Sequence, residues 1–156
     1  MRKVYARLYV GAIQDCFDQR EGWVTVHACK SPCHQRAVGY QKSLPKTHPH
    51  YLVLEGPNNL YLNMIDPAEP LFMPALFSGF LRFARQHWED GKNLLILCNQ
   101  GDSWAPSLAL LFLAKVVGAI PSENYGLASE ELVKLFPFYF PGLGIQLYLK
   151  KNWGMF

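Results

Sequence analysis

Two apolar segments separated by a short polar loop constrain the fold of this 156-residue chain more than any other feature. The first, NLLIL at residues 93–97, has the length of a buried strand. The second, SLALLFLAKVV at residues 107–117, is apolar nearly all round, as a buried helix is. Pro106 fits the first turn of that helix, because an N–H group there would have no helical acceptor. We therefore expect a strand, a loop that starts at Cys98, and a helix at the centre of the domain.

Strand-like and helix-like segments alternate along the rest of the chain. Strand patterns occupy VYARLYVGA at residues 4–12, Trp23–Cys29, and two runs within residues 51–66 that are joined by a turn at Pro57, Asn58 and Asn59. Helical patterns occupy residues 71–90, which Gly91 ends, 122–136 and 142–153, with a short helix around 34–38 inside the loop-rich segment 30–50. The alternation predicts a single α/β domain over residues 1–156, with a mostly parallel central sheet flanked by helices.

The composition narrows the functional classes. Hydrophobic residues make up 50% of the chain and charged residues 17%, as in an ordered globular domain. The net charge of +3 is spread along the chain, so we expect no nucleic-acid duplex as partner and favour a small anionic ligand. No apolar run can span a membrane, the N-terminus lacks a signal-peptide cleavage site, and four cysteines are too few for a disulfide scaffold. We expect a cytoplasmic protein with reduced thiols and leave its oligomeric state open.

Cys98 lies where a buried strand enters a loop that contains Gly101 and opens a helix. In such a loop, backbone N–H groups and the helix N-terminus converge on one point, where they bind an anion and lower the pKa of a thiol. A buried cysteine with a purely structural role is the alternative for the same pattern.

The residues around this loop resemble those of the cysteine-dependent protein tyrosine and dual-specificity phosphatases. That family carries a His-Cys pair, five further residues, an arginine, and a serine or threonine. The resemblance extends from LNMID at residues 62–66 through GKNLLILCNQGDSWAPSLALLFLA at residues 91–114 and into the C-terminal helices. It implies a dual-specificity-phosphatase-like fold with Cys98 as nucleophile, Gly101 in the phosphate loop and Asp66 as general acid.

The chain departs from the family pattern at three supports of catalysis. Trp104 stands where the family has the arginine that holds two phosphate oxygens. Indole has one N–H and no charge, so its presence removes stabilisation of the transition state worth on the order of several kcal/mol. Leu97 replaces the histidine before the cysteine, Ala105 replaces the hydroxyl residue, and Asp102 adds a carboxylate to an anion loop. We therefore expect a pseudophosphatase in which Cys98 and Asp66 are vestigial.

A basic segment is predicted to join the Cys98 loop, because the carboxyl ends of parallel strands line one crevice. Ligand contacts are expected from the Cys98 loop, with Trp104 as a stacking surface, and from the segment after strand 23–29; the residues are Asn99, Gln100, Gly101, Asp102, Ser103, Trp104, Lys30, His34 and Arg36. A solvated basic loop is the alternative for the last three. A zinc site at His27, Cys29, Cys33 and His34 is disfavoured because no second ligand pair has suitable spacing. We expect no metal and no cofactor.

Three functional hypotheses remain open. The first is a catalytically impaired protein that binds or sequesters a phosphorylated or nucleotide-like ligand, or a phosphopeptide, at the Cys98 loop. The second is an active phosphatase of unusual specificity, with Lys30 or Arg36 supplying the missing positive charge, Cys98 attacking phosphorus and Asp66 protonating the leaving group. The third is a protein-interaction module that uses the aromatic run Phe136–Phe140 and whose pocket is vestigial.

Overall fold

The computed structural model describes residues 1–17, 20–65 and 72–156. These residues form a six-stranded sheet with the order β1-β2-β6-β3-β5-β4. Its strands are β1 (Arg2–Tyr5), β2 (Leu8–Gly11), β3 (Trp23–His27), β4 (Val53–Glu55), β5 (Asn59–Leu62) and β6 (Asn93–Leu97). The central strands β2, β6, β3 and β5 are mutually parallel, and the edge strands β1 and β4 are antiparallel to their neighbours. The predicted α/β class with a mostly parallel central sheet is confirmed.

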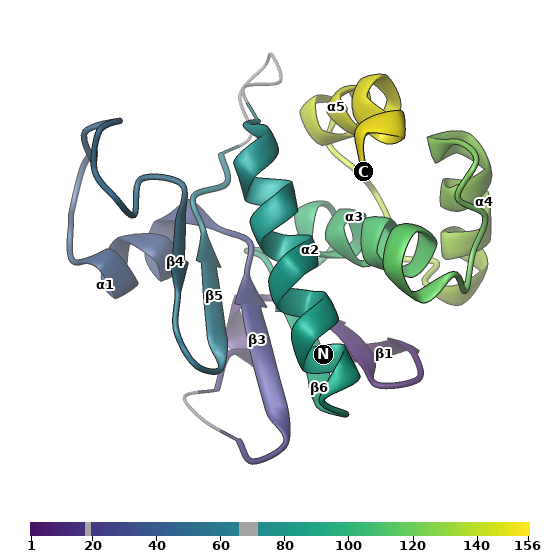
Figure 1. The fold of residues 1–156 in the computed structure, drawn as a ribbon, viewed down its shortest axis with the longest axis horizontal. Coiled ribbons are helices and arrows are strands. Elements are labelled where there is room, and N and C mark those ends of the chain that lie inside the picture. The colour runs from purple at the N-terminus through teal and green to yellow at the C-terminus, as the bar shows by residue number, and fades with distance from the viewer. Residues whose placement is uncertain (18–19, 66–71) are drawn as a thin grey trace.

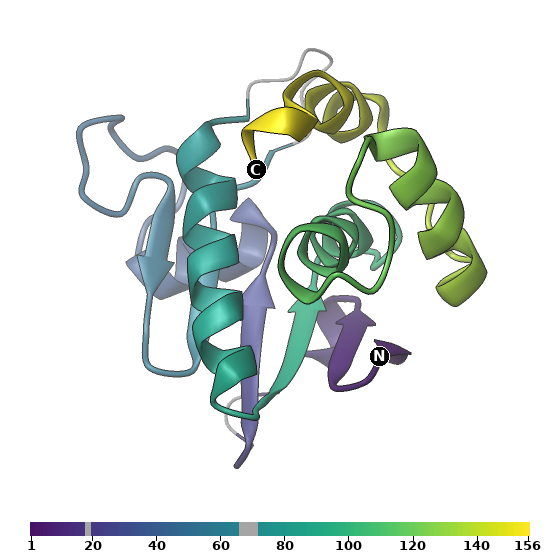
Figure 2. The same ribbon diagram turned by 45° about the vertical axis from the view of Figure 1, so that its right-hand side comes forward.

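Helices cover the sheet, and α2 lies along its length (Figures 1 and 2). The α-helices are α1 (Gln35–Val38), α2 (Pro74–Glu89), α3 (Trp104–Phe112), α4 (Tyr125–Leu135) and α5 (Leu143–Asn152). Short 3-10 or π-helical turns are η1 (Ile13–Asp15), η2 (Lys30–His34), η3 (Leu113–Val117) and η4 (Trp153–Met155). The predicted helices at 71–90, 107–117, 122–136 and 142–153 are confirmed, with shifted ends: α2 begins at Pro74 and α3 at Trp104. No helix in the described part of the chain is long and apolar enough to cross a membrane.

The two faces of β6 belong to two hydrophobic cores, because successive side chains on a strand point to opposite faces. Leu94 and Ile96 lie in the larger core, together with residues of α2, α3, α4 and α5. Leu95 and Leu97 lie in a smaller cluster, which we call the second core. It consists of buried Cys29, Cys33, Leu95 and Leu97, with partly buried Tyr9, Ile13, Phe17, Trp23, Tyr61 and Trp104 packed against them.

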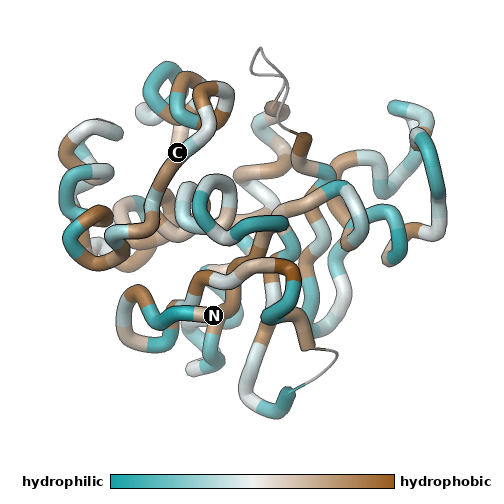
Figure 3. Tube along the Cα trace, turned by 180° about the vertical axis from the view of Figure 1, so that it is seen from behind, coloured by the Kyte–Doolittle hydropathy of each residue, from teal (hydrophilic) through white to brown (hydrophobic). Residues whose placement is uncertain are grey.

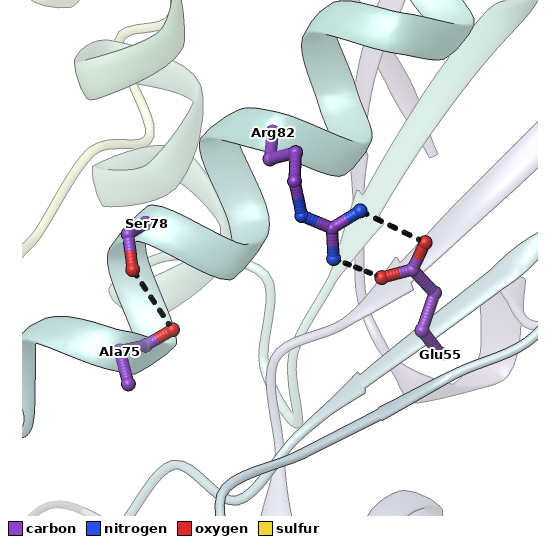
Figure 4. A network of polar contacts seen from close by, with 4 residues as sticks. All are labelled: Glu55, Ala75, Ser78 and Arg82. Carbon is purple, nitrogen blue, oxygen red and sulfur yellow. Dashed lines mark hydrogen bonds and ion pairs between the residues drawn. The ribbon is translucent and has the colours of Figure 1, made fainter.

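An ion pair joins α2 to the edge strand β4 (Figure 4). Both terminal nitrogens of Arg82 donate to the carboxylate of Glu55, and the Nη1–Oε1 distance is 3.2 Å. In the same helix, Ser78 Oγ donates to the carbonyl oxygen of Ala75 at 3.4 Å. The loop that leads into β4 is largely hydrophilic (Figure 3). β4 itself contacts β5 and α2.

The N-terminal segment differs from its prediction. VYARLYVGA was expected to be one strand, but Arg2–Tyr5 and Leu8–Gly11 form an antiparallel hairpin. Ala6 occupies the turn with φ 37°, a left-handed conformation that alanine seldom adopts. The hairpin places β2 beside β6, so the carboxyl end of β2 reaches the Cys98 loop.

Candidate active site

Three parallel strands end at the edge of the sheet where Cys98 leaves β6. The N–H of Cys98 donates to the carbonyl oxygen of Gly11 at 3.3 Å, and the N–H of Ala28 donates to that of Leu97 at 2.8 Å. The ends of β2 and β3 therefore flank the Cys98 loop. This arrangement brings the segment after β3, which carries Lys30 and Arg36, to the same edge as Cys98.

Cys98 is buried, with 3% of its surface exposed. Its sulfur accepts a hydrogen bond from the N–H of Gly101 at 3.2 Å. At least one backbone donor of the loop is thus directed at the thiol, which is the geometry expected of a loop that binds an anion at a helix N-terminus.

The Cys98 loop is held on both sides. On one side, the N–H of Ile13 donates to the carbonyl oxygen of Asn99 at 3.4 Å. On the other, the N–H of Phe140 donates to the carbonyl oxygen of Asp102 at 2.8 Å, and the N–H of Gly142 donates to Ser103 Oγ at 2.9 Å. Asn99 and its neighbour Gln100 are exposed at the tip. The loop is therefore fixed at both ends while its tip faces solvent.

Trp104 begins α3 and is half-buried. Its ring packs against both cores, and Leu97 belongs to the second of them. The indole Nε1 is buried and has no hydrogen-bond partner among the described residues. Four cavities of 410 to 480 Å³ among the described residues are lined by neither Trp104 nor Cys98. The indole fills space between the two cores here, and stacking of a ligand on Trp104 stays a prediction.

Of the three basic-segment residues predicted to bind a ligand, His34 has a different role. It is fully buried, its Nε2–H donates to the carbonyl oxygen of His50 at 2.9 Å, and Nδ1 lies 2.9 Å from Tyr40 Oη. Burial lowers the pKa of His34, which favours the neutral imidazole, and with Nε2 protonated Nδ1 accepts from the tyrosine hydroxyl. The prediction of His34 as a positively charged ligand contact is therefore corrected, because both of its nitrogens already have partners.

Lys30 and Arg36 remain available at the edge of the site. Lys30 is half-buried and its N–H donates to the carbonyl oxygen of Met64 at 3.2 Å, whereas Arg36 is exposed. Within residues 1–17, 20–65 and 72–156, neither side chain forms an ion pair. Contact of either side chain with an anion at the Cys98 loop stays a prediction. The predicted general acid, Asp66, lies outside the described residues.

The residues considered for zinc are used in other ways. Cys29 and Cys33 contact each other in the second core, where the hydrogen bond from Cys33 lowers the pKa of Cys29 and raises the pKa of Cys33. His27 Nε2 bonds Asn59 Oδ1 at 3.0 Å, and burial lowers the pKa of its ring. The described residues contain no group of three His, Cys, Asp or Glu side chains that could hold a metal ion.

Two features near the loop escaped the sequence reasoning. Buried hydroxyl groups form a chain from α3, in which Ser107 Oγ lies 3.1 Å from Tyr139 Oη, which in turn lies 2.9 Å from Tyr125 Oη. A cavity of about 480 Å³ also borders the loop, with Gln100–Asp102, Phe138 and Phe140 among the residues that line it. The aromatic run gave a signal for the cavity, but no local pattern indicates the hydroxyl chain, because its members are distant in sequence.

No protein-family model matches the chain, and no curated protein matches it. Solved structures do. The human tyrosine phosphatase-like serine/threonine/tyrosine-interacting protein superposes with a TM-score of 0.68 at 13% identity, covering 98% of this chain and 95% of that chain. Human DUSP28 gives 0.67 at 18% identity with 98% and 95% coverage, and DUSP15 gives 0.66 at 19% identity with 98% and 86% coverage. The chain therefore has a dual-specificity-phosphatase-like fold.

Proposed function

We propose that this phosphatase-like fold serves binding rather than hydrolysis, and that the chain holds a small phosphorylated or nucleotide-like ligand at the Cys98 loop without turning it over. The observation that carries the proposal is the position of Leu97 and Trp104. Both belong to the second core, so two positions at which the resembled family has polar catalytic groups are occupied by apolar packing residues. The ligand would be sequestered in a cytoplasmic setting, which stays a prediction.

The replacement of the family's arginine by Trp104 is expected to prevent turnover. Phosphoryl transfer depends on fixed charges aimed at the oxygens where negative charge shifts in the transition state. At position 104 the chain offers only an indole N–H, and this group is buried. Without a guanidinium clamp, the protein would bind a phosphate ester and its transition state with similar affinity. A site that binds both states equally well does not accelerate the chemical step.

The features that favour an anion are retained. The N–H of Gly101 points at Cys98, α3 begins at the end of the loop, and the segment that carries Lys30 and Arg36 follows β3, the strand paired with β6. The positive end of a helix and two cations without ion-pair partners in the described structure attract a phosphate. These features support binding and do not by themselves supply a catalytic step.

Hydrolysis of p-nitrophenyl phosphate tests the first part of the proposal. We expect wild-type protein to show no turnover above that of Cys98→Ser. Turnover that disappears in Cys98→Ser would instead support the active phosphatase, with Cys98 as nucleophile and Asp66 as general acid. Rapid alkylation of Cys98 by iodoacetamide near neutral pH would point the same way, because only the thiolate reacts.

Binding of phenyl phosphate and adenosine monophosphate, measured by calorimetry, tests the second part. Lys30→Ala and Arg36→Ala should each weaken binding about 5- to 10-fold, the value of one charge-assisted contact. Lys42→Ala removes an exposed lysine from the loop after α1 and serves as the matched control. Equal affinities in all three variants would show that neither Lys30 nor Arg36 contacts the ligand.

A specific observation also favours the interaction-module hypothesis. Phe138 and Phe140 are 44% and 67% exposed beside the cavity that borders the Cys98 loop. One structural neighbour is named a serine/threonine/tyrosine-interacting protein. If this face binds a protein or a phosphopeptide, Phe140→Ala should abolish capture of that partner while phenyl phosphate binding is unchanged. Loss of partner binding in Arg36→Ala would instead support the Cys98 loop as the binding site.

A further inference from the structure

A cysteine, a histidine and an asparagine from three separate segments form one chain of polar contacts. Cys16 follows η1, His27 ends β3 and Asn59 begins β5. The sulfur of Cys16 lies 4.0 Å from Nδ1 of His27, and Nε2 of His27 lies 3.0 Å from Oδ1 of Asn59. We propose that these residues form a second nucleophilic site, in which His27 activates the Cys16 thiol to accept an acyl group from an ester or a thioester.

Asn59 determines which nitrogen of His27 carries the hydrogen. Its Oδ1 can only accept, so in the neutral ring the hydrogen lies on Nε2 and the lone pair on Nδ1. Nδ1 is the atom beside Cys16, so it can take the thiol proton. Burial lowers the pKa of His27, which favours this neutral, proton-accepting form. A thiol, a base and a third group that orients the base are the parts of a cysteine acyl-transfer site.

The His27 ring is held by two neighbours on the adjacent strand. It stacks on Tyr61, with ring centroids 4.4 Å apart and planes 14° apart, and only 3% of His27 is exposed. In the parallel pairing of β3 with β5, His27 lies opposite Tyr61, and Thr25 lies opposite Asn59. The stacking surface and the hydrogen-bond acceptor therefore both come from β5. They orient the imidazole before a substrate arrives, which is where much of the advantage of a positioned base lies.

Cys16 is exposed, although the base beside it is buried. Its N–H donates to the carbonyl oxygen of Ile13 at 3.2 Å. In the same turn, Asp15 Oδ2 accepts from the N–H of Ala12 at 2.9 Å. These bonds hold η1 and the residue that follows it. An electrophile can therefore reach the sulfur from solvent while the thiol proton moves toward the interior.

Aromatic side chains lie near the Cys16–His27 pair. Phe17, the next residue in the chain, meets Trp23 edge-to-face with centroids 5.7 Å apart, and Tyr61 stacks on His27. All three aromatic residues are partly buried and pack against the second core. Such surfaces favour an acyl group with an apolar body, because contact with them removes that body from water.

The proposed step balances without a further reactant. The Cys16 sulfur attacks the carbonyl carbon of the ester or thioester as the thiol proton moves to Nδ1 of His27. A new C–S bond forms, the bond from carbon to the leaving oxygen or sulfur breaks, and the leaving atom takes the proton from the imidazolium. The products are a thioester on Cys16 and a free alcohol or thiol. The inference goes beyond the proposed function, because none of the residues assigned to the Cys98 site takes part.

The experiment treats the full chain with p-nitrophenyl acetate in the presence of a phosphine reductant. We expect release of p-nitrophenolate with an acetyl group on the peptide that carries Cys16, identified by mass spectrometry. His27→Gln should slow this acetylation about 100-fold, the low end of what a positioned base contributes. His50→Gln changes an exposed histidine outside the site and serves as the matched control, with the wild-type rate expected. Circular dichroism of each variant checks that it folds.

Two substitutions of Asn59 separate its positioning role from packing. Asn59→Leu removes the acceptor for the Nε2 hydrogen and should slow acetylation of Cys16 about 10-fold, because the ring is then free to turn or to change tautomer. Asn59→Asp keeps an acceptor at the same place and should retain the wild-type rate or exceed it. A purely structural role for Asn59 predicts no such rescue.

Several results would overturn the proposal. Acetylation at another cysteine in place of Cys16, or a Cys16 rate equal to that of N-acetylcysteine at the same pH, would show that this thiol is not activated. Equal rates in wild type and in folded His27→Gln would remove the base. Equal rates in Asn59→Leu and Asn59→Asp would remove the positioning role of the amide.

Discussion

Substitution of Gly101 by alanine tests how tightly the Cys98 loop packs against the end of β2. Gly101 has φ +79°, and a Cβ atom there would lie 2.9 Å from the carbonyl oxygen of Gly11 and 3.2 Å from the nitrogen of Ala12. These are backbone atoms of a sheet strand and its end, so they cannot turn aside as a flexible side chain would. Gly91, which follows α2, has nearly the same φ, +77°, with nothing within 4 Å of its Cβ position. It is a matched control.

The two substitutions share one cost and differ in another. A left-handed conformation costs an L-residue about 1–2 kcal/mol, which is the expected loss for Gly91→Ala. Gly101→Ala adds a backbone clash of about 1–3 kcal/mol, the usual cost of overpacking. The loss for Gly101→Ala should therefore reach about 2–5 kcal/mol, and the difference between the variants measures the contact alone.

Urea denaturation followed by circular dichroism provides the free energies of unfolding by linear extrapolation. Unchanged slopes with a lower midpoint for Gly101→Ala than for Gly91→Ala would confirm the contact. Equal losses in the two variants would show that the loop does not approach Gly11 as closely as described, and would refute the reasoning that the loop is held on this side.

Buried polar groups lead to three other expected outcomes. Burial lowers the pKa of His34, so as the pH falls the unfolded chain binds a proton at this residue before the folded chain does. The free energy of unfolding should therefore decrease below about pH 6.5, by up to about 1.4 kcal/mol per pH unit. His34→Gln should reduce this slope, as measured by urea denaturation at a series of pH values. Tyr139→Phe removes the hydroxyl between Ser107 and Tyr125 and should cost about 1–3 kcal/mol, seen as a lower Tm. Trp104→Phe removes a buried N–H that has no partner in the described part of the chain, so its free energy of unfolding should stay within about 1 kcal/mol of wild type. Trp104→Arg should lose more than about 2 kcal/mol, and a stabilised Trp104→Arg would contradict the placement of the ring.

The central strand, loop and helix could be predicted from sequence because local patterns determine them. The apolar run before Cys98 forms β6, and the segment that carries Pro106 forms α3. Both signals depend on side-chain periodicity and on the lack of an N–H in proline, which act within a few residues. The shared edge of Cys98 and Lys30 followed from the parallel arrangement of β3 and β6.

The N-terminal hairpin could not be predicted in this way. Its turn contains Ala6 at positive φ, with none of the glycine, asparagine or proline residues that usually indicate a turn. Pairing of β1 with β2 and of β2 with β6 holds the conformation, so the cause lies in tertiary contacts rather than in local preference.

The same limit applies to the site. His34 was expected to face a ligand, and its burial depends on Tyr40 and on the carbonyl of His50, which a loop without regular structure brings together. The direction of the Trp104 ring depends on Leu97 and on the cysteines that follow β3.

The joint membership of Leu97 and Trp104 in the second core has a consequence for how such a chain can change over generations. A guanidinium that arose at position 104 alone would replace an indole that packs against the second core, whose buried members are Leu95, Leu97, Cys29 and Cys33. A histidine at position 97 alone would meet the indole instead. Each single step toward a charged site therefore lowers stability before any benefit can be selected, and the two positions form an epistatic pair that makes the apolar state hard to reverse.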